Sequence, residues 1–115
     1  MTVTLHGIPN CDTVKKARAW LDARGAAHVF RDFRKVPPDA DEVRAWAAAV
    51  GWERLLNRGG TTFRKLPESE TADLDEARAV ALMVAHPSAI RRPVVAHGGG
   101  VLVGFDAGEW EAAGV

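Results

Sequence analysis

The chain contains one cysteine, Cys11, whose thiolate would be a strong nucleophile. A single thiol cannot form a disulfide within the chain or supply a cysteine cluster for a metal. Cys11 follows the loop of residues 7–10 and begins a segment with helical periodicity. Its sulfur is therefore expected near the first backbone N–H groups of a helix, which favour thiolate over thiol and lower the pKa. The alternative interpretation of Cys11 is a small, buried apolar side chain.

No second thiol is present to complete a redox cycle. In a Cys-x-x-Cys pair the second cysteine would stand at position 14, which is Val14 here. After one attack on a disulfide, the protein would remain as a mixed disulfide until a thiol from outside released it. Glutathione is the abundant cytosolic thiol, so the cysteine count predicts glutathione as a co-substrate and no tightly bound cofactor.

Arginines form the second group of residues that could take part in binding or catalysis. Arg91 and Arg92 stand together before Pro93, and adjacent guanidinium groups can gather a carboxylate or another oxyanion. A surface pair flanking the start of a strand is the alternative. Arg58 and Arg64 lie in a polar, glycine-rich segment, where they either contact the carboxylates of glutathione or belong to a solvated surface.

The elements around Cys11 form a strand–helix–strand unit. Residues 2–6 and 28–33 alternate in the strand period, and residues 11–24 place Val14, Ala17 and Leu21 on one helical stripe. Such units have parallel strands and a right-handed connection. The unit therefore puts Cys11 at the carboxyl edge of a sheet, where open α/β proteins bind ligands.

The rest of the chain predicts a helical insertion, a β-hairpin and a last helix. A helix is expected over 39–50, a polar loop over 57–66, and a long helix over 72–86 with Leu74, Ala77, Ala81 and Val84 facing inward. Two short strands, 93–97 and 101–105, flank three glycines, and Asp106 precedes a helix around Trp110. This order predicts the α/β class with a thioredoxin-like fold and a mixed central sheet.

Composition limits the remaining possibilities. With 115 residues, 47% of them hydrophobic, the chain is expected to form a single domain, residues 1–115. Fifteen basic residues balance fifteen acidic ones, which argues against nucleic acid or membranes as partners. There is no signal-peptide pattern or long apolar run, so a cytoplasmic location is expected. A monomer is expected as well. No metal site is expected, because no metal-ligand spacing connects the four histidines, His6, His28, His86 and His97.

Three segments together resemble the arsenate-reductase-like (ArsC/Spx) family of thioredoxin-fold proteins, in particular its small single-cysteine branch, known as YffB. These segments are residues 7–17, 55–66 and 91–95, and the resemblance extends over essentially the whole chain. It implies that Cys11 is the nucleophile, that Arg92 holds a bound oxyanion or glutathione, and that Pro93 follows a cis peptide bond opposite the cysteine. The assigned glutathione-binding set is Asn10, Arg58, Arg64, Arg91, Arg92 and Pro93.

The resemblance implies a glutathione-dependent thiol reductase, with glutaredoxin or an oxidised thiol substrate as further partners. Arsenate reduction is one alternative, but two features of the arsenate branch are missing here. Its histidine four residues before the nucleophile is replaced by Gly7, and one of its arginines falls near Gly104, while another falls near Asn57 or Arg58. The second alternative is an Spx-like regulator that binds RNA polymerase, although Val14 removes the Cys-x-x-Cys switch of that branch.

Overall fold

The computed structural model describes residues 3–115, so Thr2 of the predicted first strand lies outside the described residues. The chain divides into two compact units. Unit 1 comprises the described residues up to Pro37 together with Arg92–Val115, and unit 2 comprises Pro38–Arg91. The expectation of a single domain remains a prediction. None of the described helices is long and apolar enough to cross a membrane.

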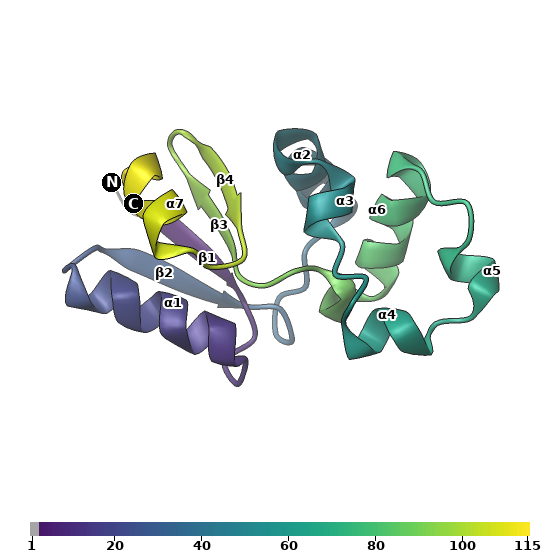
Figure 1. The fold of residues 1–115 in the computed structure, drawn as a ribbon, viewed down its shortest axis with the longest axis horizontal. Helices are drawn as coiled ribbons and strands as arrows, with labels where there is room; N and C mark the ends of the chain where they lie inside the picture. Colours follow the sequence, from purple (N-terminus) through teal and green to yellow (C-terminus); the bar gives the residue numbers. More distant parts are fainter. Residues whose placement is uncertain (1–2) are drawn as a thin grey trace. The chain divides into compact units, whose positions relative to one another are not determined.

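Unit 1 is a four-stranded mixed sheet with two helices, as predicted (Figure 1). The strand order is β2-β1-β3-β4, with β1 parallel to β2 and antiparallel to β3, which in turn is antiparallel to β4. The mixed sheet confirms the predicted α/β class. The elements of unit 1 are β1 (Val3–Gly7), α1 (Asp12–Ala23), β2 (His28–Asp32), β3 (Val94–His97), β4 (Gly100–Val103) and α7 (Ala107–Ala113).

Helices α1 and α7 pack against the same face of this sheet. Leu5, Val95 and Leu102 lie opposite one another on three adjacent strands, and therefore point to one face. The predicted apolar face of α1, Val14, Ala17 and Leu21, is buried in the same core. Trp110 of α7 is buried there as well. Gly25, with φ +65°, ends the turn after α1 in the left-handed region, as its position after the helix predicts.

Unit 2 is helical. It contains α2 (Ala40–Val50), α3 (Trp52–Leu55), α4 (Thr61–Lys65), α5 (Glu68–Thr71), α6 (Glu76–Ala85) and the 3₁₀ turn η1 (Pro87–Ala89). Asp39 starts α2 with a capping box, because its carboxylate accepts from the N–H of Glu42 and the Glu42 side chain accepts from the N–H of Asp39. The predicted start of this helix is therefore correct.

Two predictions for unit 2 are wrong. The segment 57–66 is not only a loop, because α4 begins after Gly60; its single turn buries no side chain and so leaves no apolar stripe to detect. The helix predicted over 72–86 begins only at Glu76, because Asp75 caps it by accepting from the N–H of Arg78 at 2.8 Å. Its buried face is accordingly not the predicted one and consists of Ala79, Val80, Leu82 and Met83.

Gly7 ends β1 where the strand approaches α1 closely. A Cβ at this position would lie 2.8 Å from Cγ2 of Val14, which is fully buried. Val14 cannot move aside easily, since a β-branched side chain in a helix has one strongly preferred rotamer. The Gly7 carbonyl also accepts from the N–H of Phe33 at 2.8 Å, and this bond extends the pairing of β1 with β2.

Gly7→Ala is therefore expected to destabilise the protein by about 1–3 kcal/mol, as overpacking of a core does. The free energy of unfolding can be measured by urea denaturation. In a Val14→Ala background the same Gly7→Ala change should cost less than about 1 kcal/mol, because the clashing methyl group is gone. An equal cost in both backgrounds would show that Val14 is not the cause.

Candidate active site

Cys11 lies between the end of β1 and the start of α1, at the carboxyl edge of the sheet, as predicted. It is the N-cap residue of α1, with φ −87° and ψ 127°. Its carbonyl accepts from the N–H of Lys15 at 2.9 Å, and its own N–H donates to the carbonyl of Ile8 at 3.2 Å. The side chain is partly buried and packs at the border of the unit 1 core. The sulfur is thus fixed at the first turn of a helix and remains accessible.

The surroundings of the sulfur favour the thiolate. Burial raises the pKa of the Cys11 thiol, but the backbone N–H of Val14, the guanidinium of Arg92 and the backbone N–H of Thr13 all lower it. The net effect is a pKa below the ordinary value of a cysteine. The lowered pKa of a partly exposed thiol is the property that makes a cysteine a nucleophile near neutral pH.

Sheet pairing brings Arg92 to the sulfur. Strand β3 runs antiparallel to β1, and its first residue, Val94, lies opposite His6 near the end of β1. Arg92, which precedes β3 by two residues, therefore lies at the same end of the sheet as Cys11, the carboxyl end of β1. The Arg92–Pro93 peptide bond is cis, as the resemblance implies, and Pro93 is fully buried. The carbonyl of Pro93 accepts from the N–H of Gly104 at 2.9 Å, which holds the start of β3 against the end of β4.

The other predicted ligand residues have different surroundings. Asn10 is exposed in the loop next to Cys11. Arg58, Arg64 and Arg91 belong to unit 2, and their role in binding glutathione remains a prediction. Arg91 donates from Nε to the carbonyl of Arg54 at 3.0 Å, and the Arg58 guanidinium lies 5.0 Å from the centre of the Trp52 ring. Within unit 2 these two arginines thus have local structural partners.

The sulfur lies near the first backbone N–H groups of a helix, as the sequence predicts, and the structure identifies these donors as the N–H groups of Thr13 and Val14. A side-chain pattern carries no direct signal for backbone donors, although a cysteine at an N-cap position implies them. The structure also explains the absence of a side chain at two positions: Gly7 packs against Val14, and Gly104 has φ +74°, where a residue with a side chain would be strained.

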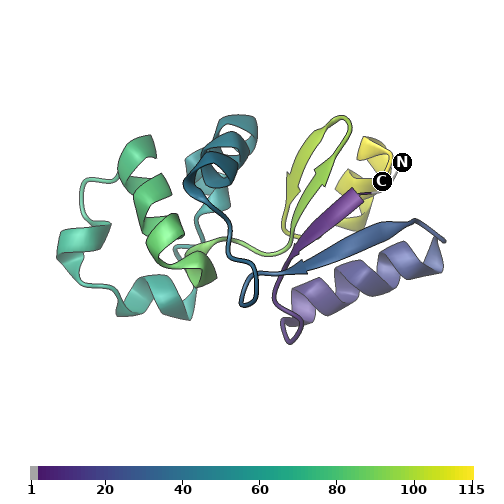
Figure 2. The same ribbon diagram turned by 180° about the vertical axis from the view of Figure 1, so that it is seen from behind.

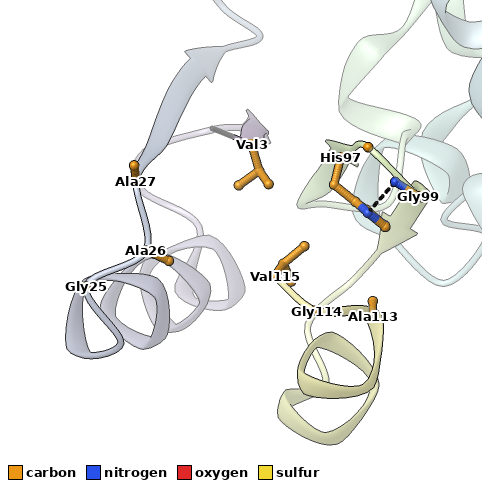
Figure 3. Close-up of a pocket in the computed structure, with 10 residues that line it drawn as sticks. Val3, Gly25, Ala26, Ala27, His97, Gly99, Ala113, Gly114 and Val115 are labelled. Carbon is orange, nitrogen blue, oxygen red and sulfur yellow. Dashed lines mark hydrogen bonds between the residues drawn. The ribbon is translucent and has the colours of Figure 1, made fainter. Parts of the chain in front are cut away.

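A cavity lies at the end of the sheet opposite Cys11. It has a volume of about 480 Å³ and is lined by Val3 at the start of β1, by residues 25–27, by the turn after His97 and by residues 113–115. Figure 3 shows the His97 imidazole directed at the N–H of Gly99, with which it forms a 3.1 Å hydrogen bond. The cavity contains no thiol among its described residues. Residues 3–115 also contain no cluster of histidine, cysteine or acidic side chains that could hold a metal ion.

The family of the chain follows from comparison with known proteins. A family model described as the ArsC family matches residues 6–113. The chain belongs to the ArsC family. The match spans the whole of unit 2 and nearly all of unit 1, and it confirms the family resemblance of the three sequence segments.

Several relatives of this ArsC-family protein match over almost their whole length. A solved structure of a protein named YFFB has a TM-score of 0.94 and 52% sequence identity, covering 96% of this chain and 97% of the other. An uncharacterized protein from Haemophilus influenzae is 36% identical over 111 residues, which are 96% of this chain and 97% of the relative. These matches confirm the thioredoxin-like α/β fold that the order of elements predicts.

Relatives with functional names are more distant. A protein of Rhizobium meliloti named arsenate reductase is 32% identical over 97 residues, which cover 83% of this chain and 69% of the relative. The global transcriptional regulator Spx of Bacillus subtilis is 28% identical over 110 residues, which cover 93% of this chain and 82% of the regulator. The family thus includes proteins named as enzymes and proteins named as regulators.

The electrostatics of the site predict the pH dependence of Cys11 alkylation. Because the pKa of Cys11 is lowered, the reaction rate with iodoacetamide should reach half its maximum at a pH below the ~8.5 of an ordinary thiol. Arg92→Gln should raise this midpoint, since the guanidinium stabilises the thiolate. Arg24→Gln, at the other end of α1, removes the same charge and should leave the midpoint unchanged. A wild-type midpoint at or above the value of an ordinary thiol would contradict the assignment.

Proposed function

We propose that this ArsC-family protein is a glutathione-dependent thiol reductase with Cys11 as its nucleophile. One observation carries the proposal. The sulfur of Cys11 lies at the start of α1, where the N–H groups of Thr13 and Val14 and the guanidinium of Arg92 stabilise the thiolate. No other residue of the 115 is a cysteine, so the second half of the thiol cycle requires an external thiol.

The cycle consists of three exchanges of sulfur–sulfur bonds. The Cys11 thiolate attacks a substrate disulfide, forms a bond to one sulfur and releases the other as a thiolate. A first glutathione thiolate displaces the bound substrate sulfur and leaves glutathione on Cys11. A second glutathione attacks this adduct, which regenerates the Cys11 thiolate and yields glutathione disulfide. The substrate disulfide is thus reduced by two electrons, and two glutathione molecules supply them.

Arg92 has two roles in this cycle. Its positive charge stabilises the Cys11 thiolate that attacks in the first exchange and that is released in the third. A guanidinium beside the sulfur also attracts anionic partners, and glutathione carries two carboxylates. Arg92 is therefore the residue of this site that favours glutathione over a neutral thiol. Glutaredoxin or another oxidised thiol protein, present with glutathione in the cytoplasm, is the partner expected for this chemistry.

Arsenate reduction is the second candidate, because a relative named arsenate reductase is 32% identical to this chain. An arsenate ion carries more negative charge than a disulfide, so it needs several cations around the nucleophile. In unit 1 the stabilising cation beside Cys11 is Arg92, and the positions of two further arsenate-branch groups are Gly7 and Gly104. Neither glycine has a side chain to contribute, which favours thiol substrates.

A purely regulatory role is the third candidate, because Spx regulators are 28% identical to this chain. A redox switch of the Cys-x-x-Cys type would need a thiol at position 14. Val14 is fully buried and belongs to the unit 1 core together with Ala17 and Leu21. The residue at the switch position is therefore a core residue here, which favours an enzyme that uses an external thiol.

Incubation with glutathione disulfide tests the reductase directly. The intact mass of the wild-type protein should increase by one glutathionyl group, and reduced glutathione should remove it. Cys11→Ser should gain no mass and should lower the glutathione-dependent reduction of hydroxyethyl disulfide to the uncatalysed rate. Arg24→Gln serves as the matched control and should react like the wild type. A thiol that stays unmodified at neutral pH would exclude the reductase and leave Cys11 with only a packing role at the border of the unit 1 core.

The arsenate alternative makes a separate prediction. Purified protein given arsenate, glutathione and glutaredoxin should form no arsenite above the level of the Cys11→Ser variant. The physical reason is the small number of cations around the sulfur. Arsenite can be measured by liquid chromatography with arsenic detection. Formation of arsenite that depends on Cys11 would make arsenate the substrate instead.

A further inference from the structure

Strand β2 is an edge of the sheet, and a groove runs along it. In the strand order β2-β1-β3-β4, β2 has a sheet neighbour on one side only. The groove has a volume of about 690 Å³ and is formed by Thr4 of β1, by β2, by Arg18 of α1, by Pro9 and by the segment that follows β2. Figures 1 and 2 both show the loop before α1 and the loop after β2 side by side at one end of the sheet.

The backbone of β2 offers hydrogen-bonding groups to this edge. The backbone N–H and carbonyl groups of the odd-numbered residues point toward β1. The Ala27 carbonyl accepts from the N–H of Val3, and the N–H of Phe33 donates to the carbonyl of Gly7. Because backbone groups alternate along a strand, the N–H and carbonyl of Phe30 point to the outer edge. An extended peptide laid along β2 would find this pair in the position that a neighbouring strand requires.

Apolar side chains accompany these backbone groups. Val29 and Val36 are 53% and 55% exposed, and both line the groove. They are the exposed large apolar side chains of the described residues. Val29 on β2 and Val36 in the segment after it provide apolar contacts for the side chains of an added strand.

The charges of the groove define what it would bind. Three cations line it, Arg18, Arg31 and Lys35, against one carboxylate, Asp32. The Arg31 guanidinium donates to the carbonyls of Val36 and Pro37, so the attraction for an acidic segment rests on Arg18 and Lys35. The Arg34 guanidinium, hydrogen-bonded to Asp32 at 3.2 Å, holds the pKa of that carboxyl below its usual range, so the acid is already paired. The Arg18 guanidinium lies 4.4 Å from the centre of the Phe30 ring, beside the outward-facing backbone pair. The groove is therefore suited to an acidic segment.

The groove opens close to the nucleophile. Pro9 is part of its wall and precedes Cys11 by two residues, so their Cα atoms are at most about 7 Å apart. A segment bound along β2 would therefore extend past Pro9 toward the sulfur of Cys11.

We propose that β2 binds an extended, acidic segment of an oxidised protein, which adds to the sheet as a strand and presents its disulfide to Cys11. This inference rests on the proposed reductase and specifies its substrate class as protein disulfides with neighbouring acidic residues. A second copy of this chain is a poorer occupant, because pairing β2 with itself would bring the cations of two grooves together.

Hydrogen exchange of the Cys11→Ser variant tests the binding step without any thiol chemistry. The probe is a peptide of alternating glutamate and valine, and the control is its lysine–valine counterpart. Saturating acidic peptide should slow exchange of the Phe30 amide at least about tenfold, and the lysine peptide should leave it unchanged. Unchanged exchange with the acidic peptide, or equal effects of both peptides, would overturn the proposal. Protection of Phe30 that grows with protein concentration alone would assign the edge to a second copy and also overturn it.

Reversing the charge of a groove residue tests whether the acidic peptide binds in the groove. Lys35→Glu should weaken binding of the acidic peptide by about three- to tenfold, because one attraction becomes a repulsion. Arg24→Glu, at the end of α1 where the guanidinium lies over the Trp20 ring and outside the groove, changes the net charge equally and should leave binding unchanged. If both variants weakened binding equally, the net charge of the protein would explain the effect, and the proposal that the peptide binds in the groove would be wrong. These measurements do not depend on Cys11 reactivity, so they can fail while the glutathione adduct forms, and the adduct can fail while they succeed.

Discussion

The close approach of β1 to α1 at Gly7 is the constraint on which the site depends. A side chain at position 7 would meet Val14 at 2.8 Å, so glycine alone lets the strand end against the first turn of the helix. Val14 anchors that turn in the core, and its backbone N–H faces the sulfur of Cys11. The same contact therefore fixes the core packing, the start of α1 and the stabilisation of the thiolate.

The charge at the sulfur comes from a distant part of the sequence. Antiparallel pairing places Val94 of β3 opposite His6 of β1, and Arg92 precedes that strand. The mixed sheet thus assembles the site from two segments that the whole of unit 2 separates in the sequence. Backbone donors from α1 are local, whereas the guanidinium depends on long-range sheet pairing. A change that disturbs β3 should therefore affect the thiolate even when α1 remains intact.

Hydrophobic periodicity was sufficient to predict most of unit 1, because its helices and strands each bury one face. It also predicts α2 correctly, but it fails for the later part of unit 2, where polar groups determine where α6 begins. Asp75 caps α6 within a segment of uninterrupted helical pattern, and Asp73 before it has φ +53°, which no periodicity indicates. The pair Arg91 and Arg92 illustrates the limit for the site. Arg91 is hydrogen-bonded to the carbonyl of Arg54, whereas Arg92 acts on Cys11. Residue type and spacing alone do not distinguish these neighbours, and only the family resemblance singles out Arg92.

A protein with one thiol must accept two different sulfur partners in succession at the same atom. A buried sulfur would exclude both of them, and a fully exposed one would lose the contacts that lower its pKa. The partly buried position of Cys11 at the N-cap satisfies both requirements, since backbone N–H groups stabilise the charge without covering the sulfur. Selectivity for the first partner must then come from the surface around the sulfur. The cationic edge of β2, beside the loop that carries Cys11, is the part of unit 1 with the geometry and charge to provide it.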